Sequence, residues 1–476
     1  MLDAGMNTIY AGLTKDQENA LKAMRDWYLN TNSLVAVLQG DAGTGKTYLL
    51  RRFVRRIVRT RVAVTAPTHK AARLMEKMIG VNAKTLQSLH GLRPNFNLDS
   101  FDIDDIKFQP IADANIRYYS LIICDECSQI GTSLHMLNMR RARQYSVKIL
   151  YVGDSYQLPP IGEKISPTFK LDNKFILTEI VRQEKDNPLI KAFQLLKEDI
   201  RSNGNNFIYN ILRKKENFNS DGHGYAVLDK VTFQKKVIEY FKSEEIEKNI
   251  NYVRYLAWTN KSINVWNSHI RNNILSTEDL VHPDDLFIGY KTIVDRFNNL
   301  TLINSEDYIV SGITKRLSED NFQTYVVELL DMARGKKTKL SIVDHRDRTW
   351  NNYKNQIRKR HVAAIYCSPS EKSMKWRNFY EYKDFHLSLV GFDLGYQNMK
   401  KYIDKDIDYG YCITVHKSQG STIDNVFINL IDICYYGGDK RKPINIKTSS
   451  PETVQLRNKL IYTAITRAKE KVYLLI

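Results

Sequence analysis

The chain has 476 residues, and its 71 Lys and Arg outnumber its 53 Asp and Glu to give a formal net charge of +18. This length exceeds what one hydrophobic core can organise and predicts about two to four domains. The positive charge favours a polyanionic partner such as nucleic acid, although a protein that is merely basic has the same composition. Because no apolar run reaches the roughly 18 residues of a membrane-spanning helix, we expect a soluble cytoplasmic protein with no membrane partner.

Five cysteines are scattered through the chain, an odd number that favours a reducing compartment. Cys124 and Cys127 form a C-x-x-C pair, but no second Cys pair or His pair lies at zinc spacing. We therefore expect neither a zinc site nor redox chemistry at this pair.

The first predicted helix opens within residues 13–21, with Thr14 as its N-cap. Gln17 would lie one turn into this helix. Its carboxamide offers one donor and one acceptor and can pair with the edge of adenine. A helical glutamine is more often a solvated residue, so both readings stay open.

A glycine loop follows the apolar run 34–38 and leads into the predicted helix 48–54. The order of strand, loop and helix, with G-x-x-x-x-G-K-T between them, is typical of a phosphate-binding P-loop. Lys46 would reach the β- and γ-phosphates, and Thr47 would place its hydroxyl on Mg²⁺. The loop consists of Gly40, Asp41, Ala42, Gly43, Thr44, Gly45, Lys46 and Thr47. These residues predict a nucleoside triphosphate site.

Residues 61–66 read as a short buried strand followed by Pro67, Thr68, His69 and Lys70. Hydroxyl groups at the carboxyl end of a strand, where a helix begins, suit contacts to backbone phosphates. Residues 92–119 then change in character, being polar with isolated aromatics, and indicate a small insertion. The aromatics are Phe96, Phe101 and Phe108. They suit either a wedge between bases or a miniature core of the insertion.

Two further strands are predicted to end in polar groups. Asp125 and Glu126 follow the apolar strand 121–124, at the edge where sheets of this class bind ligands. Asp125 would hold Mg²⁺ and Glu126 would deprotonate the attacking water. Gln157 follows the strand 148–152 and is a candidate sensor of the γ-phosphate. With the strands at 34 and 62, these strands define one doubly wound parallel sheet.

The order of motifs resembles that of superfamily 1 helicases, in the RecD-like 5′-to-3′ branch. The motifs are Gln17, GDAGTGKT at 40–47, APTHKAA at 66–72, DECS at 125–128, GDSYQLPP at 153–160, LTEIVRQ at 177–183, TVHKSQGSTID at 414–424 and YTAITRAKEKVYL at 462–474. The resemblance implies an α/β fold of two RecA-like P-loop motor domains with parallel sheets. Motor domain 1 would span 1–91 and 118–176, interrupted by a pin-like insertion at 92–117. Motor domain 2 would span 177–269 and 411–476, beginning with a strand at 175–177.

An SH3-like β-barrel at 270–410 is implied as the insertion of the second motor domain. Short strands are predicted at 308–313, 325–330 and 340–343. The stretch 346–360 is basic, and aromatics lie within it and beyond it: Trp350, Tyr353, Trp376, Phe379, Tyr380 and Tyr382. A track for single-stranded nucleic acid and a helical hook packed on the barrel explain these residues equally well.

The resemblance also assigns residues to the two ligands. Arg182 and Arg467 match arginines that stabilise charge on the γ-phosphate. Gln419 and Gly420 would touch the nucleotide, next to residues that touch DNA. The implied DNA contacts are Pro67, Thr68, His69, Lys70, Thr85, His90, Phe96, Thr259, Asn260, His416, Lys417 and Ser418.

These assignments predict an ATP- and Mg²⁺-dependent DNA helicase and single-strand translocase moving 5′ to 3′, in which two motor domains close on ATP and open after hydrolysis. It would act as a monomer on single-stranded DNA and on junctions with duplex, in the cytoplasm or, for a phage gene, the host cytoplasm. Single-strand-binding or replisome proteins are candidate partners. The alternatives are an ATPase that displaces proteins from DNA without efficient unwinding, and a non-catalytic single-strand-binding module.

Overall fold

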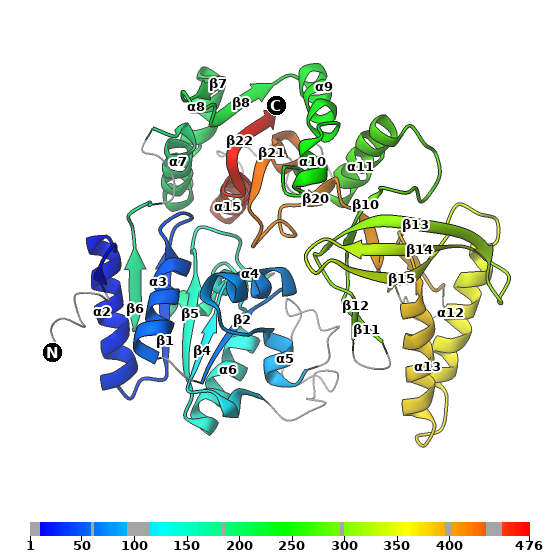
Figure 1. Ribbon diagram of the computed structural model, residues 1–476, viewed down its shortest axis with the longest axis horizontal. Coiled ribbons are helices and arrows are strands. Elements are labelled where there is room, and N and C mark those ends of the chain that lie inside the picture. The colour runs from blue at the N-terminus through cyan, green and yellow to red at the C-terminus, as the bar shows by residue number, and fades with distance from the viewer. Residues whose placement is uncertain are drawn as a thin grey trace. The chain divides into compact units, whose positions relative to one another are not determined.

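The computed structural model describes residues 10–58, 61–92, 115–160, 162–181, 186–295, 299–395, 402–434 and 450–476. The chain divides into two compact units, Met1–Ile263 with Ile413–Ile476, and Asn264–Cys412 (Figure 1). The first unit holds the motifs that indicate a nucleotide site, and the second holds most of the predicted insertion. No helix within the described ranges is both long and apolar enough to cross a membrane.

A six-stranded parallel sheet forms the first half of unit 1, in the order β3-β2-β4-β5-β1-β6. Its strands are β1 (Val35–Gly40), β2 (Val62–Ala66), β3 (Ala83–Thr85), β4 (Leu121–Cys124), β5 (Lys148–Gly153) and β6 (Lys174–Leu177). The main helices are α2 (Lys15–Asn30), α3 (Lys46–Phe53), α4 (His69–Ile79), α5 (Leu86–His90) and α6 (Thr132–Tyr145).

Helices cover both faces of this sheet, because successive side chains of a strand point to opposite faces. Ala36 and Leu38 of β1 share a core with Phe53 of α3. Val35 and Val37 instead share a core with α6. The predicted doubly wound sheet is therefore confirmed, and its four expected strands are β1, β2, β4 and β5.

One boundary prediction was wrong. We expected 175–177 to begin the second motor domain, but β6 pairs with β1 in the first sheet, with Phe175 opposite Leu38 and Leu177 opposite Gly40. Phe175 packs into the same core as α2, where it meets Trp27 edge to face. A short strand of alternating burial gives no sequence signal for the sheet that it joins.

A second six-stranded sheet has the order β20-β9-β21-β22-β8-β7. Its strands are β7 (Glu216–Phe218), β8 (Gly224–Leu228), β9 (Val253–Ala257), β20 (Cys412–Thr414), β21 (Ile423–Asn429) and β22 (Ala468–Leu475). β8, β9, β21 and β22 run parallel, whereas β7 is an antiparallel edge. Its helices are α7 (Pro188–Ser202), α8 (Asn206–Arg213), α9 (Lys230–Phe241), α10 (Glu245–Lys248), α14 (Leu430–Cys434) and α15 (Pro451–Ile465). The expected second parallel sheet is present.

Unit 2 centres on a third sheet, in the order β16-β15-β14-β13-β10-β19. Its strands are β10 (Leu286–Gly289), β13 (Asp307–Leu317), β14 (Gln323–Asp331), β15 (Lys336–Val343), β16 (His386–Leu387) and β19 (Ile407–Tyr409). The two-stranded pairs are β11 (Ile293–Val294) with β12 (Leu300–Leu302), and β17 (Phe392–Asp393) with β18 (Tyr402–Ile403). The three strands predicted here are confirmed as β13, β14 and β15, whereas the SH3-like barrel stays a prediction.

Two helices, α12 (Trp350–Ile365) and α13 (Lys372–Phe385), form a hairpin in unit 2 (Figure 1). Its aromatic residues pack inward: Tyr353 and Phe379 are buried in one cluster with Phe322 of the sheet, and Trp350 and Trp376 pack against that cluster. The packed-hook interpretation of this tract therefore fits the structure. Of the aromatics considered as a track, Tyr380 is exposed.

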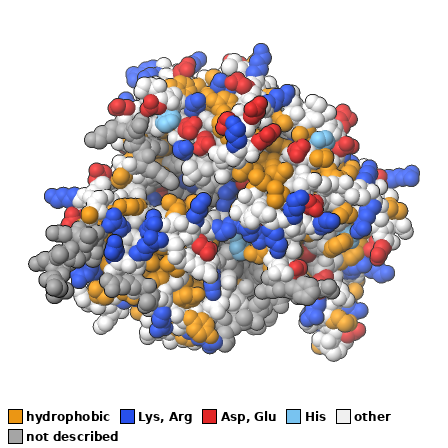
Figure 2. All heavy atoms as spheres, viewed as in Figure 1, with side chains coloured by type: hydrophobic (Ala, Val, Ile, Leu, Met, Phe, Trp, Pro, Cys, Tyr) orange, Lys and Arg blue, Asp and Glu red, His pale blue; other side chains and the backbone are white. Residues whose placement is uncertain are grey.

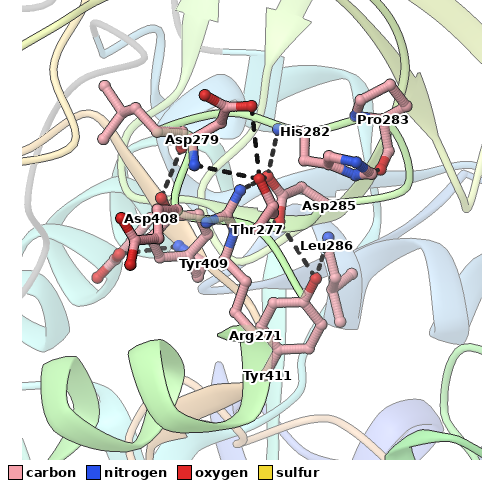
Figure 3. Close-up of polar contacts among 12 residues, drawn as sticks. Arg271, Thr277, Asp279, His282, Pro283, Asp285, Leu286, Asp408, Tyr409 and Tyr411 are labelled. Carbon is pink, nitrogen blue, oxygen red and sulfur yellow. Dashed lines mark hydrogen bonds and ion pairs between the residues drawn. The ribbon is translucent and has the colours of Figure 1, made fainter. Parts of the chain in front are cut away.

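A buried ion pair fixes α11 (Asn260–Leu275) to the sheet of unit 2 (Figure 3). The Arg271 guanidinium donates two hydrogen bonds to Asp285, of 2.6 and 2.9 Å. Burial raises the pKa of Asp285, and the guanidinium opposes that rise. The hydroxyl of Tyr411 also donates to Asp285, at 3.3 Å, so the returning chain joins the same network. A buried pair of this kind is costly to break, because removing one partner leaves the other charge uncompensated.

Candidate active site

The P-loop lies between β1 and α3, and its glycines have the backbone that the turn requires. Gly43 and Gly45 have φ of 83° and 80°, in the left-handed region that other residues avoid. The Thr44 hydroxyl donates to the Asp41 carbonyl at 2.9 Å. The Lys46 ammonium donates to the carbonyls of Gly40 and Asp41, at 2.6 and 2.8 Å. The Lys46 ammonium therefore lies across its own loop. A phosphate bound in the loop could take the place of these two carbonyls as its partner.

Gln17 lies at this loop, where its carboxamide is bonded within the protein. Its Nε2 donates to the Thr44 carbonyl at 3.0 Å, and its Oε1 accepts from the Thr14 backbone at 3.2 Å. The second bond completes a capping box with the Thr14 hydroxyl at the start of α2. Gln17 thus ties α2 to the P-loop. The adenine contact stays a prediction.

The paired carboxylates follow β4. The Asp125 backbone N–H donates to the Thr65 carbonyl at 2.9 Å, which extends the pairing of β4 with β2. Glu126 has φ of 51°, which turns the chain away from the sheet. Burial raises the pKa of Asp125 to about 7, the neighbouring charge of Glu126 adds to the rise, and Lys46 opposes it. Two adjacent carboxylates with one nearby ammonium are a site that a divalent cation would stabilise.

The second sheet contributes to the same place. A Cβ built at Gly420 would lie 3.2 Å from the Ala71 side chain and 3.9 Å from Glu126 Oε1. Gly420 therefore lies close to Ala71 in the first turn of α4 and to Glu126, the predicted general base. The sequence resemblance predicted Gly420 near the nucleotide, and the structure brings it beside Glu126.

Two buried amide atoms at this site have no partner within the described part of the chain. Gln157 Oε1 and Gln419 Nε2 are both buried without a hydrogen bond, and both side chains were predicted at the nucleotide. Unsatisfied buried polar atoms are rare and costly in folded proteins. They fit a polar ligand, and with the P-loop and the carboxylates they fit a phosphate group next to a divalent cation. No cluster of three or more His, Cys, Asp or Glu in the described ranges could hold a metal alone.

The two predicted arginines have different outcomes. Arg467 is buried at the end of α15, where its guanidinium donates to the Thr463 carbonyl at 3.1 Å and the Ser421 carbonyl at 3.4 Å. It therefore braces the segment that carries Gln419 and Gly420. Arg182 lies outside the described residues, but the adjacent Val181 N–H donates to the Gly43 carbonyl at 2.9 Å.

Sequence reasoning missed two contacts between the sheets. Lys197 of α7 pairs with the Asp41 carboxylate of the P-loop at 2.5 Å. The Tyr462 hydroxyl of α15 donates to Asp154 at 2.8 Å, and burial raises the pKa of that carboxyl. Tyr462 is the first residue of the motif at 462–474, so the sequence offered a signal for it. Lys197 gave no signal, because its helix carries no motif and the pairing is visible only in three dimensions.

The residues predicted to contact nucleic acid follow the strands as expected, but several hydroxyls serve the fold. Pro67 to Lys70 follow β2, Thr259 and Asn260 follow β9, and His416 to Ser418 follow β20. Thr68 and Thr85 accept backbone bonds at the starts of α4 and α5, Thr259 donates to Asp432, and Ser418 donates to the Val415 carbonyl. Half-buried or exposed members of the set are Pro67, Thr68, His69, Lys70, Thr259, Asn260, His416 and Lys417.

His90 does not fit its predicted role. It is fully buried, it bonds Asn138 at 2.6 Å, and the Arg141 guanidinium lies 3.1 Å from its other ring nitrogen. Burial lowers the pKa of His90 to about 3, so the ring is neutral. It holds α5 against α6 and has no surface for a ligand. Phe96, Phe101 and Phe108 lie outside the described residues.

Taken together, the fold and the site define a P-loop protein with two parallel sheets, in which segments of both sheets meet at the phosphate loop. The AAA domain family matches residues 12–209. The chain is 24% identical to the ATP-dependent DNA helicase Dda of Enterobacteria phage T4, over 97% of this chain and 98% of Dda. It is 30% identical to the ATP-dependent RecD2 DNA helicase of Deinococcus radiodurans, over 38% of this chain and 23% of that protein. Among solved structures, the Pif1 helicase from Candida albicans has a TM-score of 0.49 and 17% identity, covering 97% of this chain and 94% of that one.

The chain is therefore similar to an ATP-dependent DNA helicase along nearly its whole length, and its P-loop half matches the AAA domain family.

Proposed function

We propose that the chain is a DNA helicase and single-strand translocase that uses ATP and Mg²⁺ and moves 5′ to 3′. The observation that carries this proposal is that Gly420, which precedes the second sheet's strand β21, lies close to Glu126 at the end of the first sheet. When residues of two sheets form one site, binding of the nucleotide favours one arrangement of those sheets and its release favours another. The name of the relative Dda, an ATP-dependent DNA helicase, supports DNA as the substrate. The direction rests on the resemblance to the RecD-like branch.

The P-loop would hold the triphosphate. Lys46 would exchange its bonds to the Gly40 and Asp41 carbonyls for the β- and γ-phosphates. Thr47 and Asp125 would hold Mg²⁺, which neutralises charge that develops on the phosphates during hydrolysis. Since burial raises the pKa of Asp125 to about 7, the bound cation would also keep this carboxyl ionised at neutral pH.

Glu126 would orient and deprotonate the attacking water, and Gln157 would report whether the γ-phosphate is present. The unpartnered Gln157 Oε1 can accept a hydrogen bond from that water, while its Nε2 can donate to the phosphate. Arg182 and Arg467 would stabilise the transition state once the second sheet closes. In the described arrangement Arg467 bonds carbonyls of its own sheet, so this role requires its guanidinium to be redirected.

Single-stranded DNA would lie at the carboxyl ends of β2, β9 and β20, where the predicted contact residues gather. Backbone phosphates would be the main partners, which gives little sequence preference and a strong dependence on salt. Figure 2 shows Lys and Arg side chains spread over the visible face, in keeping with the formal charge of +18.

The direct test of the proposal is the rate of ATP hydrolysis with and without oligo-dT. We expect oligo-dT to stimulate the rate, and the stimulation to weaken as salt rises. Absence of stimulation at low salt would overturn the proposal. An ATPase that only displaces proteins from DNA would be stimulated but would leave a tailed duplex intact.

A further inference from the structure

A cavity of about 330 Å³ opens on the helical hairpin of unit 2. It is lined by residues of α12, of α13 and of the turn that joins β13 to β14. Gln356, Lys359, Arg360 and Ala363 line it from α12, Lys375 and Asn378 from α13, and Asp320 from the turn.

Helical spacing places these residues on one side of each helix. Gln356, Lys359 or Arg360, and Ala363 recur at intervals of three and four residues, and Lys375 and Asn378 are three residues apart. Tyr353 and Phe379 face the other way, into the core shared with Phe322. The hairpin thus presents a polar groove while its aromatic face holds it on the sheet.

Arg360 is held in place at the edge of this groove. Its guanidinium lies over the Tyr382 ring at 3.6 Å from the ring centre and donates to Gln356 Oε1 at 2.5 Å. Asp320 lies 3.6 Å from the same guanidinium and accepts a hydrogen bond from the Tyr382 hydroxyl at 2.7 Å. These contacts fix the arginine without burying it, so its position does not have to be ordered by a ligand.

The groove carries uncompensated positive charge. α12 contains four Lys or Arg residues and no Asp or Glu. Lys359 and Lys375 form no ion pair with any described residue, whereas Arg360 shares Asp320. Two ammonium groups, a guanidinium and the amides of Gln356 and Asn378 are the donors that recognise phosphate oxygens and sugars.

We infer that this groove binds the phosphate backbone of double-stranded DNA, as a contact separate from the single-strand face; the inference rests on the proposed function. The lining contains no aromatic ring on which an unstacked base could lie, and the nearby Tyr382 ring is covered by Arg360. Sites for single strands combine cations with stacking rings, whereas a duplex keeps its bases stacked and offers its backbone. A helicase meets such a duplex ahead of the junction that it opens.

The test compares the full-length double variant Lys359→Glu/Lys375→Glu with a control of equal charge change, Lys235→Glu/Lys242→Glu. Both control lysines are exposed, Lys235 on α9 and Lys242 directly after it. Fluorescence anisotropy measures binding to a blunt duplex and to oligo-dT across a series of salt concentrations. We expect the groove variant to bind duplex about tenfold more weakly, with a salt slope smaller by about two. Its binding to oligo-dT and its oligo-dT-stimulated ATPase should match those of the control.

Three outcomes would overturn the inference: unchanged duplex binding in the groove variant, an equal loss on oligo-dT, or an equal loss in the control. The variant Lys359→Arg/Lys375→Arg keeps both charges and should bind duplex like the wild type. Circular dichroism of each variant checks the fold. A wild-type protein whose ATPase ignores oligo-dT would instead overturn the proposed function, whatever the groove variant does.

Discussion

Two regions at the carboxyl ends of strands use their polar side chains differently. The nucleotide edge consists of the P-loop, Asp125, Glu126, Gln157 and Gln419, and the single-strand face consists of the predicted contact residues that follow β2, β9 and β20. At the nucleotide edge, buried amide atoms of Gln157 and Gln419 have no partner among the described residues. At the single-strand face, the Thr68 hydroxyl accepts a hydrogen bond from the start of α4, Thr259 donates to the Asp432 carboxylate, and Ser418 donates to the Val415 carbonyl. The first region has buried polar atoms without a partner, whereas the Thr259 and Ser418 hydroxyls already donate within the protein.

This difference indicates which groups can bind each ligand. A hydroxyl that already donates within the protein gains little from a phosphate, because it must give up one hydrogen bond to form the other. The single-strand face would therefore depend on backbone N–H groups and on the charges of Lys70 and Lys417, with the threonines holding the loops in shape. At the nucleotide edge, by contrast, the side chains themselves would bind the ligand. The predictions below test this distinction.

The largest effects are expected at the nucleotide edge, and Lys46→Ala is the first variant that tests them. Removing the ammonium leaves no cation for the β- and γ-phosphates, so oligo-dT-stimulated ATPase should fall by about a hundredfold or more. Binding to oligo-dT should change less than twofold. Normal turnover in this variant would contradict the site assignment.

Glu126→Gln should lower the hydrolysis rate by roughly 10²- to 10⁴-fold, because the amide cannot accept a proton from water. The affinity for ATP should be nearly unchanged, since Lys46 and Thr47 remain. Single-turnover hydrolysis and equilibrium nucleotide binding separate the two effects. A matched loss of binding would assign Glu126 to nucleotide binding and not to the chemical step.

A smaller effect is expected at the contact between Lys197 and Asp41. Lys197→Met should raise the KM for ATP several-fold with a modest change in kcat, because the P-loop loses its tie to α7. The control is Lys164→Met, which breaks the ion pair between Lys164 and Glu452. The side chains of these two residues are 77% and 54% exposed. Exposed pairs contribute little, so this control should match the wild type. Equal effects in both variants would refute a specific role for Lys197.

The smallest effect on binding is expected at the single-strand face, from Thr68→Ala. Loss of the cap on α4 should lower the free energy of unfolding by about 1 kcal/mol. Affinity for oligo-dT and its salt slope should stay near the wild-type values, as measured by urea unfolding and anisotropy. Lys417→Ala is the companion variant, and it should lower the salt slope by about one. A larger loss of oligo-dT affinity in Thr68→Ala than in Lys417→Ala would show that the Thr68 hydroxyl is a phosphate ligand.

The sequence was most informative where a motif requires one backbone shape. The P-loop glycines, the carboxylates after β4 and the glutamine after β5 could be predicted, because phosphate chemistry restricts both residue type and spacing. The role of His90 was mispredicted, since a motif position does not reveal that Asn138 and Arg141 enclose the ring.

Tertiary packing decided the remaining features. The edge strand β6 joins the first sheet through its register with β1, which no local pattern encodes. The aromatics of α12 and α13 suited a stacking track and a core equally, and only their contacts with Phe322 distinguish the two. Lys197 meets Asp41 across 156 residues of sequence, so its partner was out of reach for pattern analysis.

The central claim, a site closed by two sheets that drives movement along one strand, is tested most directly by strand displacement. Duplexes that carry either a 5′ or a 3′ single-stranded tail are incubated with the protein, ATP and Mg²⁺, with the Glu126→Gln variant as a control. We predict that the wild type unwinds the 5′-tailed duplex alone and that the variant unwinds neither. Unwinding of only the 3′-tailed duplex would contradict the direction, and failure on both duplexes would contradict the helicase.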